Sequence, residues 1–185
     1  MQSVPIDARE RRFQAVFSAM LAAFSYPGRL QAPWPAATPC IDACTAIADV
    51  LIDLETSFYT PDAELHQRLI RTGARVKPPE QADYQFYPLL SEANLPALQA
   101  APVGSYLYPD HAATLVIGCL FAAGLTLRLQ GPGIQSTIEQ PIDQLPAAFW
   151  TLRTQVIQYP RGWDVFLLDG SRLLGLPRTT HAEIL

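Results

Sequence analysis

The chain has 185 residues, of which 49% are hydrophobic and 16% charged, and this globular composition excludes a disordered protein. With a formal net charge of −4 and Arg11-Arg12 as its only basic pair, it lacks the basic stripe of nucleic-acid-binding domains, so we expect no DNA or RNA partner. The N-terminus has no signal-peptide core and the cysteines number only three, which indicates a reduced, cytoplasmic protein without a disulfide framework.

The first predicted element is an amphipathic helix. Asp7 and Glu10 have the spacing of a capping box, and apolar residues then recur at helical spacing over residues 13–24. Pro27 and Gly28 form the turn that ends this helix, because Pro cannot continue it and Gly permits a left-handed conformation.

Helices and strands alternate in the next part of the chain. Thr38-Pro39 and Thr60-Pro61 are typical helix starts, and Thr72-Gly73 is a typical helix end. The predicted elements are a helix over residues 40–51, a strand over 56–59, a helix over 61–72, a strand over 83–87 and a weak helix over 94–100 broken at Pro96.

Residues 112–127 form a stretch of sixteen residues without a charge. A membrane-spanning helix needs about 20 apolar residues. Gly118 and Gly124 interrupt the stretch and β-branched residues favour strand, so we predict two buried strands joined by a tight turn at residues 122–124. We therefore expect no membrane partner.

The last third of the chain is predicted to hold a turn, a helix and a hairpin. Gly131 and Gly133 mark the turn, and a helix is predicted over residues 145–158. Strands over 163–168 and 172–176, with Asp169-Gly170 between them, give the strongest hairpin signal. The whole pattern predicts a single α/β domain, 1–185, with a mixed sheet flanked by helices.

Few residues offer chemistry. Cys40 and Cys44 share a helix face but lack further ligands near by, so we interpret them as core residues and predict no metal site. Lys77 is the only lysine and lies in a polar turn, a poor place for the imine that pyridoxal phosphate needs, so no cofactor is expected. Signatures of a serine nucleophile or a zinc protease are missing, and we assign no catalytic residue.

The C-terminal tail is the one candidate binding segment. It combines a planar guanidinium, two hydroxyl groups and an imidazole in four consecutive residues, Arg178, Thr179, Thr180 and His181, with Glu183 just beyond. These groups could bind a phosphate or phosphonate, bind a partner chain, or lock the tail onto its own domain. The sequence leaves these alternatives open.

Residues 170–181, Gly-Ser-Arg-Leu-Leu-Gly-Leu-Pro-Arg-Thr-Thr-His, resemble the C-terminal signature of the PhnH subunits of the carbon–phosphorus lyase system. Three other segments resemble the same family in order and spacing: the first helix with its ending Ser-Tyr-Pro-Gly, residues 126–134, and residues 159–164.

This resemblance implies a fold similar to that of pyridoxal-phosphate transferases but without the cofactor. It implies a subunit, itself non-catalytic, of a core complex with PhnG, PhnI and PhnJ, and a homodimer when isolated. That complex forms a ribose 1-alkylphosphonate 5-triphosphate from ATP and an alkylphosphonate. The alternative hypothesis is a free-standing phosphate-ester transferase or hydrolase that uses Arg178, His181 and Glu183.

Overall fold

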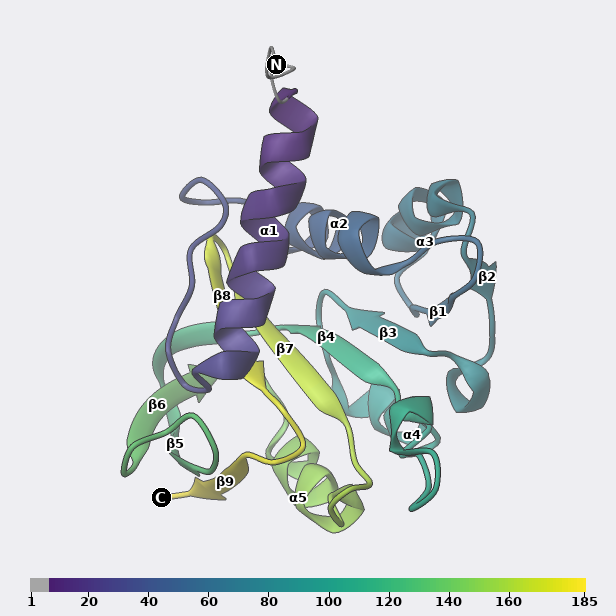
Figure 1. Ribbon diagram of the computed structural model, residues 1–185. Helices are drawn as coiled ribbons and strands as arrows, with labels where there is room; N and C mark the ends of the chain where they lie inside the picture. Colours follow the sequence, from purple (N-terminus) through teal and green to yellow (C-terminus); the bar gives the residue numbers. More distant parts are fainter. Residues whose placement is uncertain (1–6) are drawn as a thin grey trace.

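The computed structural model describes residues 7–185 and contains two β-sheets (Figure 1). The larger has six strands, in spatial order β2 (Arg75–Val76), β1 (Ser57–Tyr59), β3 (Tyr84–Tyr87), β4 (Thr114–Gly118), β7 (Asp164–Asp169) and β8 (Arg172–Leu176). All neighbouring pairs are parallel except β7 and β8, which form an antiparallel hairpin. The predicted α/β class with a mixed sheet is confirmed.

The smaller sheet is antiparallel and has the order β6 (Ile138–Asp143), β5 (Leu120–Gln130) and β9 (His181–Ile184). The turn predicted at residues 122–124 is wrong. The chain passes from β4 into β5 around Cys119, and residues 122–124 lie within β5, where its register with β6 shifts. Alternating apolar residues predict strands but do not show where the chain changes sheet.

Helices cover both faces of the larger sheet, as Figure 1 shows. Those on one face are α1 (Ala8–Ser25), α2 (Cys40–Leu51) and α3 (Ala63–Leu69), and those packed with the smaller sheet on the other are α4 (Leu95–Gln99) and α5 (Ala147–Val156). Short 3-10 helices lie at Ile70–Thr72, Pro79–Gln81, Glu92–Asn94 and Pro109–His111. None of the helices in residues 7–185 is long and apolar enough to cross a membrane.

Two hydrophobic cores lie on opposite faces of the larger sheet because side chains alternate along its strands. On β7, Phe166 belongs to the core under α1 and α2, whereas its neighbours Val165 and Leu167 belong to the core that contains α5. Phe24 of α1 stacks on Phe166 with the ring centroids 4.1 Å apart. The second core lies next to the C-terminal tail and so supports the candidate site.

The first helix begins as predicted, with Asp7 and Glu10 forming a capping box. Its apolar face is only partly covered: Val16 is buried, but Phe17 is 50% exposed and Leu21 is 54% exposed. α1 lies directly on β8, since a Cβ atom added at Gly175 would be 2.6 Å from the carbonyl oxygen of Ala23. The helix is therefore fixed along one edge and leaves an apolar stripe on the surface.

Two predicted details differ from the structure. Pro96 lies in the first turn of α4 rather than breaking it, because a helix leaves its first N–H groups free in any case. Asp169 pairs with Arg172, so the hairpin turn is Gly170-Ser171 and not Asp169-Gly170. Gly170 has φ +54°, the left-handed conformation that such a tight turn requires.

The cysteines allow a direct chemical check of the first core. The Cys44 thiol donates a hydrogen bond that lowers the pKa of Cys40, which is half-buried, while burial raises the pKa of the buried Cys119. The thiolate is the reactive form. Iodoacetamide is therefore expected to label Cys40 first, and at lower pH than it labels a free cysteine peptide. Peptide mass mapping of partly labelled protein checks this, and equal labelling of Cys119 would contradict it.

Candidate functional site

The four predicted site residues lie on the segment that connects the two sheets. Pro177 ends β8, and the chain then crosses to β9, where His181 pairs with Gln130 of β5. The side chains separate along this crossing: Thr180 is buried, at 1% exposed, whereas His181 is exposed. The strand β9 itself was not predicted, because a tail this short and polar carries no clear strand pattern.

Arg178 is bound within the chain. Its Nε lies 3.2 Å from both carboxylate oxygens of Asp164, and its Nη2 lies 2.6 Å from Oδ2. Its Nη1 donates to the carbonyl oxygens of Pro109 at 2.5 Å and Pro160 at 3.2 Å. The Asp164 carboxylate also accepts from the Arg178 backbone N–H at 2.8 Å. One arginine thus ties the tail to the start of β7 and to two loops.

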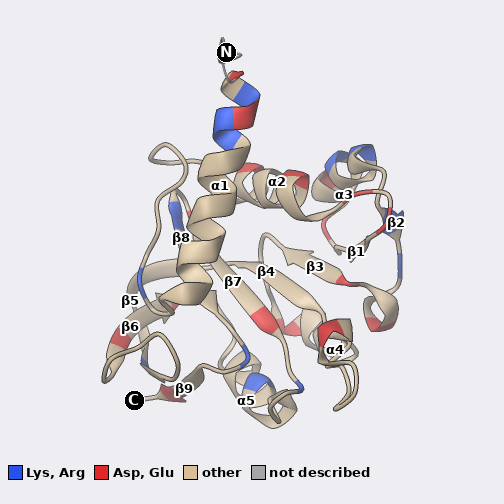
Figure 2. Cartoon of the chain, in the orientation of Figure 1, with Lys and Arg blue, Asp and Glu red and all other residues tan. Residues whose placement is uncertain are grey.

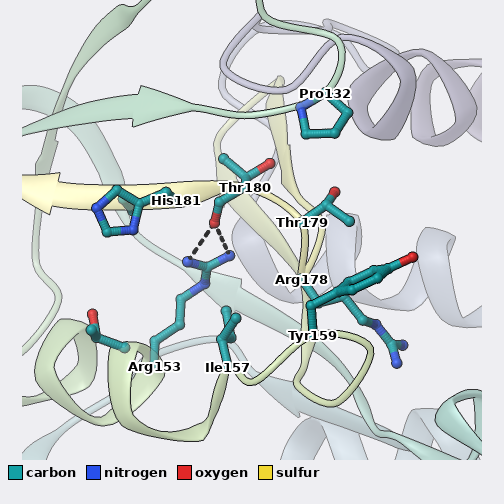
Figure 3. Close-up of a pocket in the computed structure, with 10 residues that line it drawn as sticks. Pro132, Arg153, Ile157, Tyr159, Arg178, Thr179, Thr180 and His181 are labelled. Carbon is teal, nitrogen blue, oxygen red and sulfur yellow. Dashed lines mark hydrogen bonds between the residues drawn. The ribbon is translucent and has the colours of Figure 1, made fainter. Parts of the chain in front are cut away.

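A second arginine, Arg153, lies beneath the tail and was not singled out from the sequence. It projects from α5, is 3% exposed, and donates to the carbonyl oxygens of Thr180 and Pro177 at 3.1 Å (Figure 3). Burial lowers the pKa of Arg153 to about 10, opposed by the charge of Asp164, so the group is charged at neutral pH. Its position on the same buried helix face as Phe149 and Trp150 was the available signal.

A hollow of about 480 Å³ opens between the tail and the C-terminal end of α5. It is lined by Pro132, Arg153, Thr154, Ile157, Tyr159, Arg178, Thr179, Thr180, His181 and Ala182. In Figure 3, Arg153 reaches from α5 to the tail, with His181 to one side and Tyr159 to the other. All four predicted tail residues therefore border one hollow, although the Arg178 guanidinium is directed toward Asp164.

The predicted turn residues hold the wall of this hollow. Gly131 has φ +144°, and a Cβ atom there would lie 2.7 Å from the carbonyl oxygen of Thr179. Gly133 has φ +84°, and a Cβ atom there would lie 2.4 Å from the carbonyl oxygen of Ser25 and 2.8 Å from Cδ of Pro27. The β5–β6 turn is thus wedged between the tail and the end of α1, next to Gly28.

The residues of the alternative hydrolase do not converge. Glu183 forms an ion pair with Arg128 at 3.5 Å, and Arg178 is held by Asp164, while His181 lies on the exposed β9. Lys77 lies in a loop after β2 and is half-buried. Within residues 7–185, no three His, Cys, Asp or Glu side chains lie close enough together to hold a metal ion.

The fold and site together define an α/β protein whose polar residues line a binding hollow and are not arranged as a nucleophile with its base. Comparison with known proteins gives the family. Residues 6–183 match the family described as "Bacterial phosphonate metabolism protein (PhnH)". A protein of Stutzerimonas stutzeri named "Putative C-P lyase subunit protein HtxG" is 32% identical over 193 residues, covering 100% of this chain and 95% of that protein. The chain belongs to the PhnH family, and the resemblance seen in the sequence is confirmed.

Proposed function

We propose that this protein is a non-catalytic subunit of a bacterial carbon–phosphorus lyase. The observation that carries the proposal is a match along the whole chain to a C-P lyase subunit protein of Stutzerimonas stutzeri. The dispersed positions of Arg178, His181 and Glu183 support a subunit without its own catalytic centre and disfavour the free-standing hydrolase.

Within the lyase, the proposed role is to support the formation of a ribose 1-alkylphosphonate 5-triphosphate in a cytoplasmic core complex with PhnG, PhnI and PhnJ. The isolated protein is proposed to be a homodimer, and its fold to be that of a pyridoxal-phosphate transferase without the cofactor. The single domain, 1–185, is proposed to act as one rigid unit.

Exposed apolar side chains support a role in assembly. Leu107 is 84% exposed and lies between the exposed Tyr106 and Tyr108, and Tyr159 of a second loop is 71% exposed. Arg161 lies over the Tyr106 ring at 5.7 Å and so joins the two loops. Aromatic residues are enriched in protein interfaces, and clustered exposed apolar side chains usually mark an interaction surface.

Co-expression with PhnG, PhnI and PhnJ tests the proposal. A tag on PhnG is expected to retain this chain through size exclusion, in a complex larger than either component alone. A variant with Leu107→Ser and Tyr108→Ser is expected to fold but to leave the complex, because it removes exposed apolar surface only. Glu80→Gln, on another exposed loop, is the matched control. Elution of the unmodified chain apart from PhnG, PhnI and PhnJ would contradict the proposal.

A further inference from the structure

The charge of Arg153 is not balanced by a carboxylate of its own. It donates only to backbone carbonyl oxygens, and the nearby Asp164 carboxylate is bonded to Arg178. The ten residues that line the hollow include two arginines and one histidine but no aspartate or glutamate. Figure 2 shows the same imbalance on α5, which carries a basic segment and no acidic one. Burying an unpaired charge is costly, so an anion in the hollow would be stabilised.

Hydrogen-bond donors also remain unused. A guanidinium has five N–H groups, and Arg153 makes three hydrogen bonds, with its Nε buried and without a partner. The hydroxyl oxygen of Thr180 is buried and has no partner either. Buried polar groups are nearly always hydrogen-bonded in native proteins, so unsatisfied groups beside a hollow indicate a missing ligand.

The donors surround the hollow from several elements. The Arg153 guanidinium comes from α5, the hydroxyl groups of Thr179 and Thr180 from the crossing, and the His181 imidazole from β9. A planar carboxylate is suited to one fork, whereas a tetrahedral phosphorus oxyanion has three oxygens that accept from different directions. The volume of about 480 Å³ leaves room for such a group together with a substituent.

We propose that the hollow between α5 and the tail is a binding site for a phosphate or phosphonate group of a small molecule, with Arg153 as its principal anion ligand. The site lies in the isolated chain, so the proposal stands whether or not the chain enters a lyase complex. Arg178 positions the tail that carries Thr179, Thr180 and His181, and Arg153 supplies the charge.

The test is a titration of the purified protein with inorganic phosphate and, separately, with methylphosphonate, against sodium chloride at equal ionic strength. Calorimetry is expected to show saturable binding of at least one oxyanion and none for chloride. Arg153→Met is expected to weaken this binding by about tenfold or more, since it removes a charge-assisted contact. Arg128→Gln removes an arginine that does not line the hollow and is expected to bind as the unmodified chain does.

Nuclear magnetic resonance of the imidazole groups gives a second readout that needs no variant. His181 lines the hollow and His66 lies on α3, so phosphate is expected to shift the His181 signals and leave those of His66 unchanged. This result decides the question if Arg153→Met does not fold. Absence of saturable binding, equal binding by folded Arg153→Met, or an unmoved His181 signal during saturation would each overturn the proposal. Failure of the co-expression experiment would not affect these measurements, so the two proposals fail separately.

Discussion

Arg178→Ala is expected to lower the free energy of unfolding by about 3 kcal/mol, because it breaks a largely buried ion pair and leaves the partner carboxylate unpaired. The side chains of Arg178 and Asp164 are only 15% and 22% exposed. The variant also removes the donors to the carbonyl oxygens of Pro109 and Pro160. Of the alternatives that the sequence left open for Arg178, the contacts favour the one in which it locks the tail onto its own domain.

Chemical denaturation of Arg178→Ala, Asp164→Asn and the double variant measures this contribution. The two single variants are expected to lose similar free energy and the double variant less than their sum, as in any pair that acts together. Arg128→Ala is the matched control, since its ion pairs with Glu139 at 3.7 Å and Glu183 at 3.5 Å are long and exposed, and such pairs contribute about 0–1 kcal/mol. Arg178→Ala with an unchanged denaturation midpoint would show that the tail is not held by this contact.

Much of the fold could be predicted from local patterns. The capping box at Asp7, the proline starts of α2 and α3, and the hairpin of β7 and β8 each depend on residues close in sequence. β6 and β9 were missed because they are defined by pairing with β5, and pairing between distant segments leaves little trace in a single sequence. Strand order was beyond reach for the same reason.

The candidate site could be predicted only in part. The tail was found because four polar residues follow one another, and the structure places all four beside one hollow. Their separate contacts could not be predicted, since Arg178 is bound by Asp164, which is fourteen positions away. Arg153 was missed because a single arginine in a helix resembles a solvated residue, and only the packing of Phe149 and Trp150 around it shows that it is buried.

The second large effect is expected in growth. In the bacterium that encodes this chain, deletion of its gene is expected to abolish growth on a phosphonate as sole phosphorus source, because a complex enzyme fails when a subunit is missing. Growth on inorganic phosphate is expected to be unchanged. A plasmid copy of the gene is expected to restore growth on the phosphonate, and Arg128→Gln, remote from the hollow, is expected to restore it equally.

The growth of the deletion strain on a phosphonate that the parent strain uses is the most direct test that this PhnH-family protein is a subunit of a carbon–phosphorus lyase. The predicted result is no growth without the gene and full growth with it, provided that the genes for PhnG, PhnI and PhnJ are intact. Undiminished growth of the deletion strain on the phosphonate would contradict the account.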